Sequence, residues 1–104
     1  MSDATETRKD RLRHLANEVF PAAARAGRYP IVFNHCFLRV VYDNLLGARW
    51  QDVLARGKPA IHQLTDEQLD QAIALGEKLI SNRDTCVRLN RRSLAWRGKR
   101  GGKE

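Results

Sequence analysis

Cysteine is scarce in this chain, and its two examples, Cys36 and Cys86, lie far apart. Two separated thiols cannot build the dense disulfide framework of a small secreted domain. Neither belongs to a CxxC pair or to a Cys/His series with zinc spacing, so we expect no metal site. Both lie in apolar sequence, which predicts free thiols that behave as small buried hydrophobic groups in the cytoplasm.

Long apolar runs are also missing. No segment approaches the roughly 18 residues that a transmembrane helix needs, and the residues after Met1 show no apolar signal segment, so we expect no membrane association. No glycine pattern resembles a phosphate-binding loop or a dinucleotide fingerprint, and we expect no cofactor. His14 and His62 have no partner at ligand spacing, which favours ordinary surface or half-buried histidines.

What remains is the composition of one small folded domain. The chain has 104 residues, of which 42% are hydrophobic and 30% charged. This length allows one modest core, and the composition is not that of a disordered chain. We predict an all-α fold of four to five helices packed in a single small domain over residues 1–97, followed by a flexible basic tail over 98–104.

The apolar spacing and the turn residues place the helices. Pro21 is expected either to kink the first helix or to begin a second one. The connection near Ser81 and Asn82 makes the last two helices compatible in length with a helix-turn-helix unit, although such hairpins are common in proteins that bind no DNA. The first expected helix begins near Thr5 or Thr7. The others cover about 33–46, 50–54, 65–80 and 83–96.

Two helix starts carry local signals. Thr65 with Gln68 matches a capping box, and Asn82 can cap the last helix. The β-branched residues around 31–41 would also suit a strand. A helix is preferred there because Asn34 can act as its N-cap, with Phe33 and Leu38 as a hydrophobic staple, and because Gly47 suits its C-terminal end.

The helix over 33–46 is apolar around most of its circumference, which is typical of a central helix packed on several sides. We therefore expect Phe37 and Val41 to be buried. Its polar residues His35, Arg39 and Asp43 follow one another at intervals of four and share one side. Such a row can serve acid–base chemistry, but an Arg39–Asp43 ion pair is the favoured interpretation. These three residues are the only candidates for a catalytic role, and no serine or aligned cysteine accompanies them.

Positive charge is concentrated at the C-terminal end. The formal net charge is +7, and from Val87 onward there are seven basic residues and one acidic residue, a net charge of +6. Arginine outnumbers lysine by fourteen to five, and the guanidinium group suits bidentate contacts with phosphate. A genome rich in G and C would produce the same bias. A local positive field attracts phosphates or acidic proteins.

The last expected helix separates apolar from basic residues. Cys86, Val87, Leu89, Leu94 and Trp96 occupy one half of its circumference, and Arg88, Arg91 and Arg92 gather on the other. Trp96 stands beside Arg97, so it can stack on a base or simply close the core. The candidate nucleic-acid-binding residues are Arg88, Arg91, Arg92, Trp96, Arg97, Lys99 and Arg100.

Three functions follow, in order of preference. The first is a small non-enzymatic nucleic-acid-binding accessory protein that contacts the phosphates of DNA or RNA through its basic C-terminal helix and tail. The alternative is a protein–protein interaction adaptor or regulator that presents the same basic face to an acidic partner. A small enzyme using His35, Arg39 and Asp43 ranks third.

Overall fold

The computed structural model describes residues 2–98 of the chain. Within this range there are helices and turns but no strand, which confirms the all-α prediction. The predicted tail over 98–104 lies outside the described residues, apart from Gly98. The elements in order are α1 (Ser2–His14), the π-helical turn η1 (Leu15–Val19), α2 (Phe20–Gly27), α3 (Asn34–Leu46), the 3₁₀ turns η2 (Trp50–Asp52) and η3 (Ala60–His62), α4 (Asp66–Ser81) and α5 (Arg83–Trp96).

The three N-terminal elements form one rod with a wide turn in the middle. The backbone N–H of Phe20 donates to the carbonyl of Leu15, five residues earlier, which is the bond of a π-helix. Pro21 follows in the first turn of α2, where its missing N–H is tolerated. The expected disturbance at Pro21 is therefore a restart of the α-helix after one π-helical turn.

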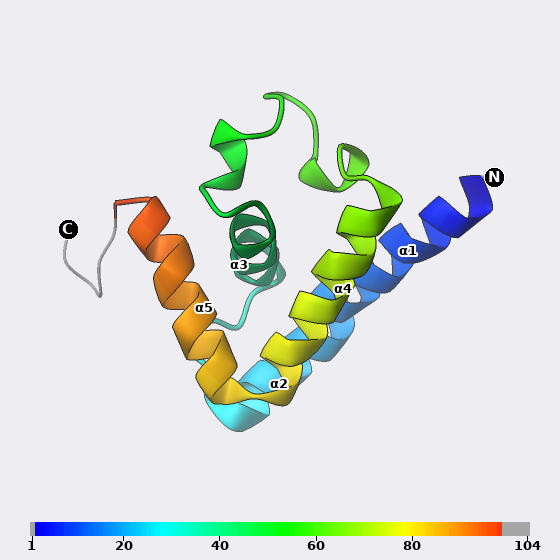
Figure 1. The fold of residues 1–104 in the computed structure, drawn as a ribbon. Coiled ribbons are helices and arrows are strands. Elements are labelled where there is room, and N and C mark those ends of the chain that lie inside the picture. The colour runs from blue at the N-terminus through cyan, green and yellow to red at the C-terminus, as the bar shows by residue number, and fades with distance from the viewer. Residues whose placement is uncertain (1, 99–104) are drawn as a thin grey trace.

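The remaining helices make a V around a central helix. In Figure 1, α4 and α5 diverge from the turn at Asn82, and α3 is seen end-on between them. The first helix, α1, packs along α4, while α3 packs against both α4 and α5. No helix within residues 2–98 is long and apolar enough to cross a membrane.

The core is centred on α3, as predicted. Phe37 and Val41 are fully buried, and the ring of Phe37 lies 4.7 Å from that of Phe20. Gly76 allows α4 to approach closely, because a Cβ atom at this position would lie 2.8 Å from the Phe37 ring. The most apolar helix of the sequence thus occupies the centre of the fold.

Two of the three predicted N-caps are confirmed, and the first helix begins at Ser2 rather than near Thr5 or Thr7. Thr65 and Gln68 form the full capping box of α4, with hydrogen bonds of 2.9 and 3.1 Å. Asn82 caps α5 by accepting from the N–H of Thr85. Gly47 ends α3 in the left-handed conformation, at a φ of 71°, as the sequence indicated.

The predicted cap of α3 is wrong. Phe33 occupies the N-cap position, and the amide of Asn34 donates instead to the side chain of Asn17 at 2.7 Å. Phe33 is 56% exposed, and its ring stacks on that of His35. A partner on the neighbouring η1 turn therefore takes the Asn34 side chain away from its own helix.

Candidate nucleic-acid interface

Three arginines gather on the solvent face of α5. Arg88, Arg91 and Arg92 are all exposed, and their spacing of three and four residues places them along one side of the helix. Together with Asp84 and Val87 they line an open hollow of about 550 Å³. Within residues 2–98, none of the three arginine side chains makes a hydrogen bond or an ion pair. The opposite face of α5 buries Cys86, Leu89 and Ser93.

The basic residues of α1 are in a different situation, because α4 supplies acids to them. Arg8 donates to Asp70 at 2.8 Å, and Arg11 donates to Glu77 at 2.8 Å. Asp66 lies 3.6 Å from a second nitrogen of Arg8. The α1–α4 side of the molecule is thus largely charge-balanced, whereas no arginine of α5 forms an ion pair with an acidic side chain within residues 2–98.

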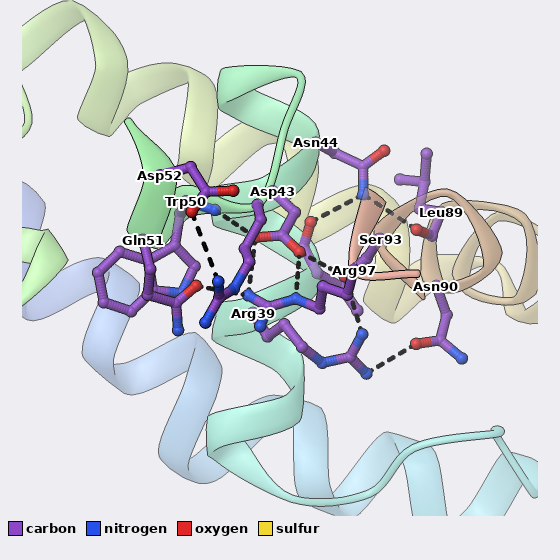
Figure 2. A network of polar contacts seen from close by, with 12 residues as sticks. Arg39, Asp43, Asn44, Trp50, Gln51, Asp52, Leu89, Asn90, Ser93 and Arg97 are labelled. Carbon is purple, nitrogen blue, oxygen red and sulfur yellow. Dashed lines mark hydrogen bonds and ion pairs between the residues drawn. The ribbon is translucent and has the colours of Figure 1, made fainter. Parts of the chain in front are cut away.

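Arg97, the C-cap residue of α5, differs from Arg88, Arg91 and Arg92 because its side chain has partners. Its Nε and Nη2 atoms donate to the two oxygens of Asp43 at 2.7 and 3.1 Å, and Nη2 also donates to Gln51 at 2.9 Å (Figure 2). Asp43 is fully buried, and the Arg97 side chain is only 15% exposed. This guanidinium therefore joins the C-terminal end of α5 to α3.

Asp43 is the centre of a wider polar network. Its carboxylate also accepts from the hydroxyl of Ser93 at 2.7 Å and from the backbone N–H of Trp50 at 2.9 Å (Figure 2). The carboxylate has four donors in all, so its burial is compensated by hydrogen bonds and by the positive charge of Arg97. The network fixes α5 and the η2 turn to the end of α3.

The favoured Arg39–Asp43 ion pair is wrong, because Arg97 pairs with Asp43 instead. Arg39 donates to the hydroxyl of Ser93 and to the side chain of Asn90, both at 2.8 Å. Ser93 thus stands between Arg39 and the carboxylate, accepting from one and donating to the other. His35 is exposed and stacked on Phe33, 5.7 Å between ring centroids, so the row does not converge on one site.

Of the three remaining predicted interface residues, the structure describes one. Trp96, at the end of α5, is 39% exposed. This exposure does not decide between the two roles that the sequence allowed, stacking on a base and closing the core. Lys99 and Arg100 lie outside the described residues. Of the predicted set, the structure brings Arg88, Arg91 and Arg92 together and assigns Arg97 to the polar network.

Neither cysteine is paired. Cys36 is half-buried and Cys86 buried, and both are free thiols, as predicted. Burial raises the pKa of Cys86 to about 11, so this thiol stays protonated at neutral pH. Among the described residues there is no group of three His, Cys, Asp or Glu side chains placed to hold a metal ion.

A second basic feature lies between α3 and α4 and was not predicted from the sequence. Arg49, Arg56 and Lys58 lie around a second hollow, together with Trp50. The available signal was three cations and a tryptophan within ten residues of sequence. Comparison of the chain with protein-family models, curated protein sequences and solved structures gives no match.

Proposed function

We propose that this protein is a small non-enzymatic nucleic-acid-binding accessory protein that uses the outer face of α5. The observation that carries the proposal is the exposure of Arg88, Arg91 and Arg92 on one side of a helix without any acidic partner in residues 2–98. Like charges at this spacing destabilise a helix by about 0.2–0.5 kcal/mol for each pair. A polyanion that binds along the face would offset this repulsion.

Phosphate is the ligand that best suits these side chains. Guanidinium groups bind phosphate oxygens in a bidentate manner, and such charge-assisted bonds are stronger than bonds between neutral groups. Contacts with the phosphate backbone position a protein without reading base sequence. We therefore expect affinity that depends strongly on salt and only weakly on nucleotide sequence.

The adaptor alternative rests on the same face. Val87 lines the hollow beside the arginines, and Trp96, one turn after Arg92, is partly exposed. An acidic peptide with an apolar residue would satisfy both features. The two functions differ in their ligand. The first requires that the protein bind nucleic acid without any other partner, and the second requires an acidic protein.

A gel-shift panel separates them. Double- and single-stranded DNA and RNA are tested at low salt against the wild-type protein and a variant with Arg88→Gln, Arg91→Gln and Arg92→Gln. The matched control carries Arg13→Gln, Arg25→Gln and Lys78→Gln, which removes the same charge from α1, α2 and α4. We expect the wild type and the control to shift at least one nucleic acid at micromolar protein, and the α5 variant to lose the shift.

The same panel can contradict the proposal. If the folded wild type shifts no nucleic acid at low salt, the proposal is wrong. Binding of polyglutamate that the α5 variant loses and the matched control keeps would then favour the adaptor. Circular dichroism of all three proteins shows that loss of binding is not loss of fold.

A further inference from the structure

The segment between α3 and α4 encloses a small basic hollow that the α5 face does not include. Arg49, Trp50, Gln51, Arg56 and Lys58 line it, and its volume is about 250 Å³. Three of these five side chains are cationic. The hollow lies next to the C-terminal end of α5, because Gln51 accepts a hydrogen bond from Arg97.

Most of the positive charge at this hollow is unpaired. Arg49 contacts Asp52 at 3.4 Å, and both side chains are largely exposed, so this ion pair is weak. The side chains of Arg56 and Lys58 make no ion pair or hydrogen bond within residues 2–98. An anion entering the hollow would therefore meet two cations that need not first leave another partner.

The loop that carries these cations is held in one shape. The side-chain amide of Gln63 accepts from the N–H of Ala55 at 2.7 Å and donates to the carbonyls of Ala55 and Lys58 at 3.1 and 3.0 Å. Gly57 adopts a φ of 80°, which lets the chain turn sharply between Arg56 and Lys58. A loop that is ordered before binding loses less entropy when a ligand arrives.

Contacts with the interior of the fold hold Trp50, the aromatic residue of the hollow, in place. Trp50 is half-buried, and its ring meets that of Tyr42 at 75° with 5.9 Å between centroids. Its backbone N–H is held by the buried Asp43 carboxylate. A fixed indole beside cations is the combination that binds a nucleotide, because the base stacks on the ring and the phosphate pairs with the charges.

We propose that this hollow binds one nucleotide unit, with its phosphate at Arg56 and Lys58 and its base against Trp50. The volume is slightly below the roughly 300–1,000 Å³ of pockets that enclose drug-sized ligands, so the hollow has room for no more than one unit. The unit can be a free mononucleotide or one residue of a single strand. The site does not depend on the α5 face.

Tryptophan fluorescence reports on this site directly. The chain has two tryptophans, so Trp96→Phe leaves Trp50 as the only indole. We expect adenosine monophosphate to quench this protein saturably. Adding Arg56→Gln and Lys58→Gln should weaken the binding about tenfold or more, since two charge-assisted contacts are lost. The matched control, Arg25→Gln with Lys78→Gln, should bind as before.

Further arms distinguish the sources and keep the site separate from α5. In the triple α5 variant, single-stranded oligoadenylate that binds much more tightly than the mononucleotide indicates a strand as the ligand of the hollow, and equal affinity indicates a free nucleotide. The triple α5 variant should keep its response to the mononucleotide, even if α5 binds no nucleic acid. Absence of saturable quenching at millimolar nucleotide would overturn the proposal, as would inorganic phosphate competing as strongly as the nucleotide does.

Discussion

Asp43 illustrates how one buried side chain can decide the arrangement of three elements. It lies on α3, yet its partners come from the η2 turn and from the end of α5. The ion pair with Arg97 joins residues 54 positions apart in the sequence. Local spacing indicated Arg39, four residues away, as the partner. The choice between the two depends on where α5 packs, which no local pattern reveals.

Replacing Arg97 by methionine tests this network. The change keeps much of the side-chain volume but leaves the Asp43 carboxylate buried without its counter-charge. We expect the free energy of unfolding to fall by about 3–5 kcal/mol. Urea denaturation measures it, with Arg88→Met on the exposed face of the same helix as the control, expected to stay within about 0.5 kcal/mol of the wild type. Similar losses in both variants would show that the network adds nothing specific.

At the scale of single elements, the sequence predicts best where the signal is local. The starts of α4 and α5 and the end of α3 followed from Thr65, Asn82 and Gly47 because each cap involves residues within one turn. The cap of α3 was wrong because the side chain of Asn34 bonds to Asn17 across the fold. The burial of Phe37 was predictable because its helix is apolar on nearly all sides.

Two substitutions of Thr65 test the capping box of α4. Thr65→Ala removes the acceptor for the N–H of Gln68 and should lower the free energy of unfolding by about 1 kcal/mol. Thr65→Asp supplies another acceptor and a negative charge at the helix N-terminus, so it should be nearly neutral. Thermal melts of the two variants check this. Equal destabilisation by both changes would mean that the hydroxyl has a different role.

The whole molecule divides into a charge-balanced side and a basic side. The distribution of charged residues along the sequence predicted the excess of positive charge after residue 86. The helical periodicity predicted that Arg88, Arg91 and Arg92 share a face. Neither could show that Arg97 turns inward or that the loop over 55–58 forms a basic hollow. The position of Arg97 depends on a contact between segments that are distant in sequence. The shape of the loop depends on side-chain hydrogen bonds from Gln63, which periodicity does not reveal.

Buried acidic groups should make the fold sensitive to alkali. Burial raises the pKa of Cys86 from 9.0 to about 11 and that of Tyr42 from 10.0 to about 12. The folded state therefore holds these protons more tightly than the unfolded state, so the free energy of unfolding should fall as the pH rises from about 9 through 12. Melting temperatures across this range measure the fall.

A pair of cysteine variants assigns the first part of this decline. Cys86→Ala should flatten the loss of stability between pH 9 and 11, whereas Cys36→Ala should leave the slope as it is in the wild type. A wild-type melting temperature that stays constant up to pH 11 would contradict the account.

The salt dependence of nucleic-acid binding shows whether phosphates bind along the α5 face. Each neutralised phosphate releases condensed counterions, so four to six contacts predict a slope of about −3 to −5 for log K against log salt. Removing the charges of Arg88, Arg91 and Arg92 should flatten the slope by about 2–3, because about 0.9 is lost for each phosphate contact with double-stranded DNA. The control lacking Arg13, Arg25 and Lys78 charges should keep the wild-type slope. Equal slopes for the α5 variant and the wild type would show that the α5 face is not where the phosphates bind.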